Sequence, residues 1–96
     1  MPSFVLVGHD APESAEARKR HRPAHLEGLE AFEAVGRIHF AGPMLGEDGQ
    51  PVGSLVIFEA GDLEEARRIA ARDPYVTEGV FERHEVRGVR RVFPRS

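Results

Sequence analysis

Two residues of this chain, His25 and Asp73, have a type and a position suited to acid–base chemistry. In a helix that begins at Pro23, a rotation of about 100° per residue places His25 on the stripe that holds Leu29 and Phe32. His25 therefore faces inward, where an unsatisfied polar group costs about 1 to 3 kcal/mol. Its partner is either a backbone carbonyl, which makes His25 a core residue, or a carboxylate, which makes it a general acid or base.

Asp73 precedes Pro74 at the predicted end of the second helix. A carboxylate in the last turn of a helix meets the negative end of the macrodipole, so a cationic or hydrogen-bonding partner would explain its presence. The alternative is that Asp-Pro simply opens a turn.

The elements that must position these residues follow from hydrophobic periodicity and turn signals. Pro23 is expected in the first turn of its helix, with residues 13–21 as a separate turn or a kinked lead-in. Asp62 is expected to cap the second helix, with Glu65 reaching back. The predicted elements are a strand at 3–8, a helix at 23–35, a strand at 37–41, a loop at 42–53, a strand at 54–59, a helix from 62 to 73, a turn at 75–79 and a strand from 80 to about 92.

This order, βαββαβ, predicts one α+β domain over residues 1–96, with a four-stranded antiparallel sheet and two helices on one face, as in ferredoxin-like proteins. The start of the first helix and the end of the second then lie at the same edge, where His25 and Asp73 can meet. The same edge receives His9, Asp10, Gly42, Pro43, Met44, Gly53, Ser54 and Gly79.

Two of the predicted strands, 3–8 and 54–59, are apolar on both faces. Helices cover only one face of such a sheet, so the other is expected to pack against the same face of a second copy. The alternative is a monomer that exposes a few β-branched residues.

Several short motifs occur along nearly the whole chain: Arg22-Pro-Ala-His25-Leu, Gly36-Arg37, Ala41-Gly-Pro-Met44, Gly53-Ser54, Asp73-Pro-Tyr-Val76 and Gly79-Val80. Together they resemble the YCII-related (YciI-like) family. The resemblance implies a dimeric α+β barrel fold, a catalytic dyad of His25 and Asp73, Arg22 as an anion or carbonyl ligand, and glycines that let substrate approach the backbone. It assigns nothing to His9, Asp10 or His21. The substrate-binding candidates are Arg22, Gly42, Pro43, Met44, Gly53, Ser54, Tyr75 and Gly79.

Other chemistries have less support. The chain has no cysteine, and His9, His39 and His84 fall on different strands, so we expect no metal site. The basic run Arg18, Lys19, Arg20 and Arg22 is interpreted as a solvated helix face. No phosphate-binding loop or nucleophile elbow is present, and Ser54 would need a base within reach.

Three functions are compared. The leading hypothesis is a cofactor-independent enzyme, lyase- or isomerase-like, whose His25 and Asp73 act on an anionic or phenolic small molecule. The second is a non-catalytic ligand-binding or regulatory module. An RNA-binding domain is disfavoured, because the net charge is −3 and the strand at 54–59 lacks the basic and aromatic pattern. Nothing resembles a signal peptide or membrane span, so we expect the protein to be soluble and cytoplasmic. The apolar second face of the sheet leads us to expect a homodimer.

Overall fold

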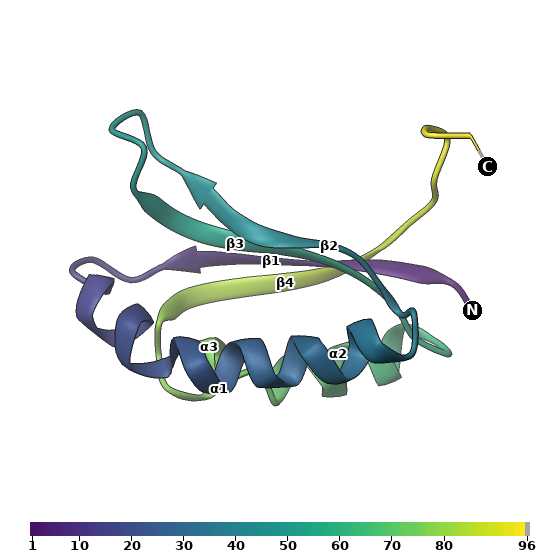
Figure 1. The fold of residues 1–96 in the computed structure, drawn as a ribbon, viewed down its shortest axis with the longest axis horizontal. Helices are drawn as coiled ribbons and strands as arrows, with labels where there is room; N and C mark the ends of the chain where they lie inside the picture. The colour runs from purple at the N-terminus through teal and green to yellow at the C-terminus, as the bar shows by residue number, and fades with distance from the viewer. Residues whose placement is uncertain (96) are drawn as a thin grey trace.

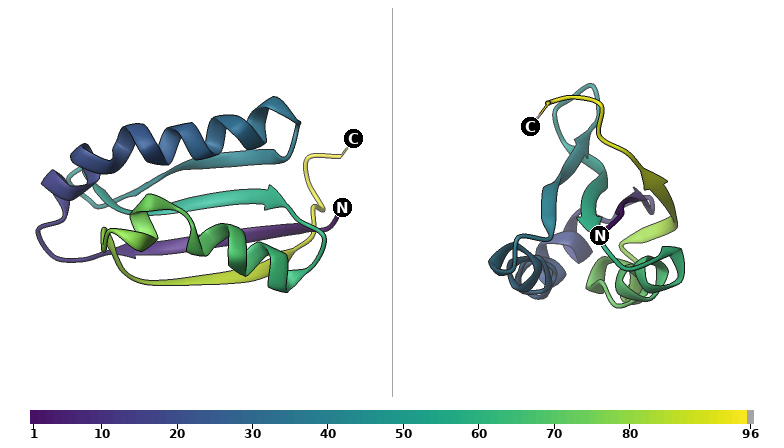
Figure 2. Two further views of the ribbon diagram at one scale, coloured as in Figure 1. Left: turned by 90° about the horizontal axis from the view of Figure 1, so that it is seen from below. Right: turned by 90° about the vertical axis from the view of Figure 1, so that its right-hand side faces the viewer.

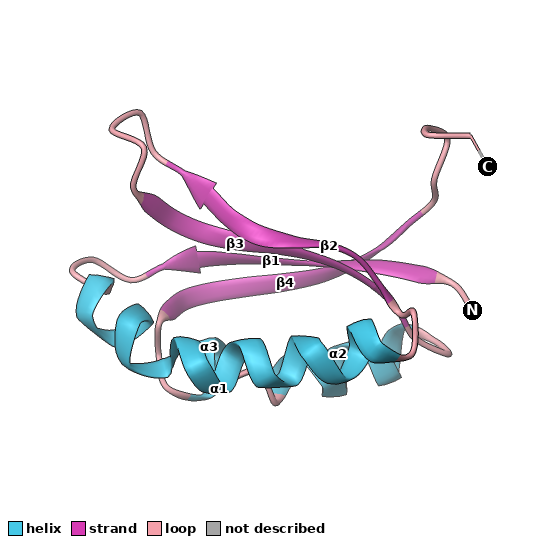
Figure 3. Cartoon of the chain, in the orientation of Figure 1, coloured by secondary structure: helices cyan, strands magenta, loops and turns pink. Residues whose placement is uncertain are grey.

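The computed structural model describes residues 1–95 as a four-stranded antiparallel sheet with helices on one face (Figure 1, Figure 3). The strand order is β2-β3-β1-β4, so the two strands nearest the chain termini in sequence, β1 and β4, are neighbours. The predicted ferredoxin-like βαββαβ fold is confirmed. The elements are β1 (Ser3–Asp10), α1 (Ala15–Ala34), β2 (Ile38–Leu45), β3 (Pro51–Glu59), α2 (Leu63–Ala71), α3 (Pro74–Thr77) and β4 (Phe81–Val89).

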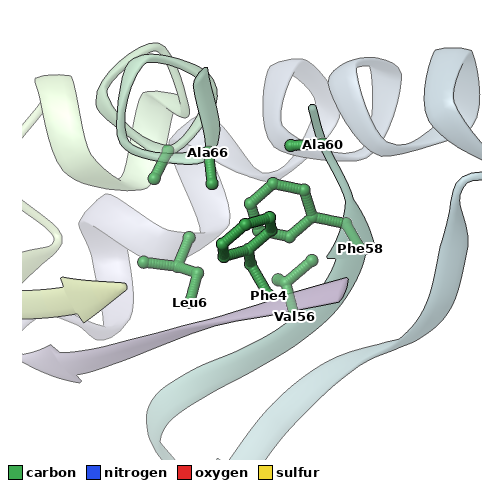
Figure 4. Close-up of a cluster of buried hydrophobic side chains, with 7 residues drawn as sticks. Phe4, Leu6, Val56, Phe58, Ala60 and Ala66 are labelled. Atoms are coloured by element: carbon green, nitrogen blue, oxygen red, sulfur yellow. The ribbon is translucent and has the colours of Figure 1, made fainter. Parts of the chain in front are cut away.

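The core lies between the sheet and the helices, because the paired strands β1 and β3 place alternate side chains on the helix side of the sheet. Phe4 pairs with Phe58 and Leu6 with Val56, and these four side chains are buried on the helix side. Ala66, on the inner face of α2, completes the cluster shown in Figure 4. Since two aromatic rings and two aliphatic side chains share this layer, the small alanine lets α2 approach the sheet closely.

The opposite face of the sheet is apolar as well. Val5 pairs with Ile57 and Val7 with Leu55, and all four are only partly buried. All three helices lie on the other side, while the β2–β3 hairpin and the segment after β4 rise on this side (Figure 1). We name the sheet face that carries Val5, Val7, Leu55 and Ile57 the outer face.

Helix α1 corrects the prediction of a break at Pro23. It runs without interruption from Ala15 to Ala34, with Pro23 inside it. Proline lacks an amide hydrogen and so leaves the carbonyl four residues earlier, that of Lys19, without its helical partner. Both Lys19 and Pro23 are exposed, so water can satisfy that carbonyl and the helix continues.

The expected loop at 42–53 is also corrected, because most of it is strand. β2 extends to Leu45 and β3 begins at Pro51, leaving a tight turn in which the Gly46 amide donates to the Gln50 carbonyl at 2.8 Å. Gly53 belongs to the ladder: a Cβ there would collide with the Gly8 carbonyl oxygen, a contact that only glycine avoids.

The other element ends differ in smaller ways. β1 extends to Asp10, β4 covers Phe81–Val89, and residues 74–77 of the expected turn form α3. The predicted cap of α2 is confirmed, since the Glu65 amide donates to Asp62 Oδ1 at 2.8 Å. No helix within residues 1–95 is both long and apolar enough to cross a membrane.

Candidate active site

His25 and Asp73 are in direct contact, as the topology predicted. The His25 Nδ1 atom lies 2.9 Å from Asp73 Oδ1 and 3.0 Å from Oδ2. Both side chains are largely buried, and α3, which follows Asp73 directly, packs against α1. The partner of His25 is therefore a carboxylate and not a backbone carbonyl.

Asp73 also begins α3. It is therefore both a carboxylate with a partner and the residue that opens a turn before Pro74. Its Oδ1 atom accepts a hydrogen bond from the Tyr75 amide at 2.8 Å, which makes it the N-cap of that short helix. A carboxylate is favourable there because it satisfies a free amide at the positive end of the helix. The cap holds the carboxylate in place beneath His25.

The second ring nitrogen of His25 is open. Among residues 1–95, the hydrogen bonds of the ring run only from Nδ1 to Asp73, and every buried side-chain nitrogen or oxygen has a partner. The Nε2 atom therefore reaches solvent. If Nδ1 carries the hydrogen donated to Asp73, the lone pair is on Nε2, where it can accept a proton from a bound molecule.

Tyr75 fixes the plane of the His25 ring. The two rings stack with centroids 3.9 Å apart and an interplanar angle of 8°. The Arg18 guanidinium lies over the Tyr75 ring at 4.9 Å. Since Arg18 and His25 are two turns apart on α1, Tyr75 inserts between them. Burial raises the pKa of the Tyr75 phenol, and the positive charges of Arg18 and Arg22 oppose that rise.

Arg18 links three elements behind the dyad. Its Nε and Nη2 atoms bond to the Asp10 carboxylate at 2.6 and 3.2 Å, and Nη2 also donates to the Gly53 carbonyl and Ser54 Oγ, each at 2.7 Å. The prediction that Arg18 lies on a solvated helix face is thus wrong. The Ser54 hydroxyl is buried and bonds to Arg18, and within residues 1–95 no histidine or carboxylate bonds to it, so the nucleophile interpretation gains no support.

An open pocket of about 510 Å³ lies between α1, along its length from Ala15 to Leu29, and the β2–β3 hairpin. Arg22 is exposed at its wall and forms no ion pair within residues 1–95, and Lys19 lies beside it. The pocket is therefore cationic at one side and suited to an anion. Its lining includes six predicted site residues: Arg22, His25, Gly42, Pro43, Ser54 and Tyr75.

Three predicted binding residues do not line this pocket. Met44 and Gly53 pair across β2 and β3, and Gly53 contributes only its carbonyl, to Arg18. Gly79 has a φ of +73° just after α3, so its role is to end that helix. Asp73 lies behind His25 and lines a different cavity. Within residues 1–95, no three metal-ligating side chains converge.

Sequence reasoning missed Arg18 and Asp10. Arg18, Arg22 and His25 follow the i, i+4, i+7 spacing of one helix face, which is a signal for a shared site. A helix that starts at Pro23, as predicted, does not include Arg18, so that prediction hides the signal. Asp10 lies at the predicted edge, but no local pattern marks it as a partner of Arg18.

Comparisons with known proteins agree with this architecture. A model of the YCII-related domain matches residues 3–90. Protein YciI of Escherichia coli O6:H1 is 38% identical over 96 residues, covering 94% of this chain and 98% of the relative. A protein named derivative of benzaldehyde biosynthesis cluster protein C, from Emericella nidulans, is 38% identical over 74 residues, covering 70% of this chain and 76% of the relative.

One solved structure is similar in both fold and sequence. It is 5-chloro-2-hydroxyhydroquinone dehydrochlorinase (TftG) of Burkholderia phenoliruptrix, in complex with 2,5-dihydroxybenzoquinone. The TM-score is 0.78 at 31% identity, over 88% of this chain and 90% of that chain. The fold is that of the dimeric α+β barrel class, as the resemblance implied.

Proposed function

This chain belongs to the YCII-related domain family, and we propose that it is a cofactor-independent enzyme that transfers protons on a small anionic or phenolic molecule. The observation that carries the proposal is the contact between His25 Nδ1 and the Asp73 carboxylate, which leaves Nε2 open. The reaction is of the lyase or isomerase kind, because both need a proton moved and neither needs a redox group.

In this mechanism His25 Nε2 removes a proton from the substrate and returns it to the product or the leaving group. The Asp73 carboxylate stabilises the imidazolium that forms and holds the ring in its orientation. The face of Tyr75, stacked on the ring, adds attraction for that cation. Arg22 and Lys19, at the pocket wall, bind the negative charge of the substrate.

The chemistry of a relative supports the reaction class. TftG is named for removing hydrogen chloride from a hydroxylated ring and was crystallised with a dihydroxybenzoquinone. Such an elimination takes a proton from one atom while a leaving group departs from another. A histidine held by a carboxylate beside a cationic pocket supplies the base and the binding site for an ionised hydroxyl group.

A binding module is the alternative, because Arg22 and Lys19 could retain an anion without any reaction. The experiment that separates the two supplies 5-chloro-2-hydroxyhydroquinone to the protein and measures chloride release. In parallel, thermal stabilisation by 2,5-dihydroxybenzoquinone measures binding. Binding together with chloride release supports the enzyme, whereas binding alone favours the module.

Variants assign the roles. His25→Gln should lower turnover by a factor of about 100 to 10,000, the usual contribution of a positioned acid–base group. Arg22→Gln should weaken binding of the quinone. The matched control is Glu27→Gln, which changes an exposed residue of α1 that lines neither cavity at His25. Turnover that survives in His25→Gln would contradict the proposal.

A further inference from the structure

A second cavity lies on the other side of His25, in the layer between α1 and α2. It measures about 290 Å³, and its floor is the inner face of the sheet at Leu6, Val56 and Phe58. Figure 2 shows α1 and α2 on the same side of the sheet. We call this cavity the interhelical cleft.

The cleft is an apolar hollow beside the core that is partly open to solvent. Leu29, Phe32, Ile38 and Ile69 pack against the buried cluster yet keep part of their surface exposed, and all four line the cleft. An apolar hollow of this size with a few polar groups at one end has the usual form of a small-molecule site.

Gly28 keeps the cleft open. It is in the middle of α1, where glycine is among the least favourable residues for a helix, and it lines the cleft. A Cβ built at Gly28 would have no heavy atom within 4 Å. No neighbouring atom is close enough to exclude a side chain at this position, and its φ is not positive. The backbone therefore does not require glycine here, and the effect of the missing side chain is to leave free volume.

One end of the cleft is polar, since His25, Arg72 and Asp73 line it. We propose that the interhelical cleft binds the compact apolar group of a small molecule, a single substituted aromatic ring or a branched alkyl group of similar size. Its polar substituent would point to that end. The size supports this occupant, because a cavity of about 150 Å³ already accommodates benzene. The proposal does not depend on whether His25 is a catalytic base.

The test uses toluene and p-cresol, two probes of nearly equal shape that differ in one hydroxyl group. Methyl NMR of the full chain should show saturable shifts confined to Leu29, Val56 and Ile69, and p-cresol should bind more tightly than toluene. Octanoate, a linear chain, should bind more weakly than either. Stronger binding by octanoate, or shifts that do not saturate, would overturn the proposal.

A variant that fills the cleft completes the test. Gly28→Leu should abolish the toluene shifts while leaving the melting temperature unchanged or higher, because leucine favours the helix and the space is empty. Ala31→Leu, at another lining position, should weaken binding and serves if Gly28→Leu does not fold. The control, Glu27→Leu, adds the same side chain outside the cleft and should bind as wild type does. Toluene shifts that persist in both filled variants would refute the site.

Discussion

Asp73 performs two tasks with one carboxylate, and these tasks respond differently to substitution. Its Oδ1 atom accepts from the Tyr75 amide, which caps α3, and both oxygens face His25 Nδ1. Asparagine caps helices about as well as aspartate. It cannot, however, stabilise an imidazolium by its charge. The cap and the dyad are therefore separable at this position.

We predict that Asp73→Asn lowers turnover by a factor of about 100 to 10,000 while changing the free energy of unfolding by less than about 1 kcal/mol. Asp73→Ala should lose turnover and, in addition, about 1 kcal/mol of stability because the cap is gone. Kinetics and urea unfolding of the two variants provide the measurements. Equal turnover in Asp73→Asn and wild type would show that Asp73 is only a structural residue.

Tyr75 offers a direct spectroscopic test of the site. It is the single tyrosine of a chain that has no tryptophan, so the absorbance of tyrosinate reports this residue alone. Burial raises the pKa of its phenol above the ordinary value of 10.0. We predict a titration midpoint above that value in the folded protein, and a return to the ordinary value in urea. Coincident curves would contradict the buried environment.

The same shift fixes the sign of a stability effect. Because the folded pKa of Tyr75 is raised, the folded protein keeps the proton longer than the unfolded chain does. This contribution to stability is complete below the unfolded pKa and is lost as pH rises through the folded pKa. Arg22→Gln removes a charge that lowers the pKa of Tyr75, so the titration midpoint of Tyr75 should be higher in this variant than in the wild type.

At the scale of elements, Arg18 joins α1 to the ends of β1 and β3. The Asp10 side chain is 6% exposed and its carboxylate has Arg18 as its ion-pair partner. Removing one member of a buried pair leaves the other charge uncompensated, which typically costs about 3 to 5 kcal/mol. Arg18 thus ties the start of α1 to the sheet edge through an ion pair and two further hydrogen bonds.

We predict that Arg18→Met lowers the free energy of unfolding by about 3 kcal/mol, measured by urea denaturation. The control is Lys19→Met, which removes the next positive charge from an exposed position on the same helix. Lys19→Met should change stability by less than about 0.5 kcal/mol. If the two variants unfold at the same urea concentration, Arg18 does not hold α1 to the sheet.

At the scale of the whole molecule, the outer face remains to be covered. Val5, Val7, Leu55 and Ile57 form paired rows on it, and Phe40 beside them is 52% exposed. Contiguous apolar surface of this kind is uncommon on monomers. We infer that a second copy packs on the outer face, with a two-fold axis between the sheets.

The expected result of light scattering is a particle of twice the 10.6 kDa chain mass. Ile57→Asp should release monomer and lower stability together, because it places an unpaired charge in the interface. Leu63→Asp makes a similar exchange at the start of α2, away from the outer face, and should stay dimeric. A wild-type particle of 10.6 kDa at micromolar concentration would refute the dimer.

The sequence by itself determined the βαββαβ order, the cap of α2 and the sheet edge at which His25 can meet Asp73. Each follows from local patterns plus one topological rule: hydrophobic period indicates strand or helix, and βαββαβ connectivity sets which ends share an edge. The apolar outer face was equally visible, because strand side chains alternate between faces. These inferences need no knowledge of side-chain packing.

Only the tertiary structure decided the rest. Continuation of α1 through Pro23 depends on the exposure of Lys19, and the partnership of Arg18 with Asp10 joins residues whose local patterns are unrelated. Met44 and Gly53 reach the predicted edge, but the register of β2 on β3 pairs them away from the pocket. Stacking of Tyr75 on His25 and the opening at Gly28 arise from the placement of the helices on the sheet. Distances between elements result from packing the whole core, which no short stretch of sequence encodes.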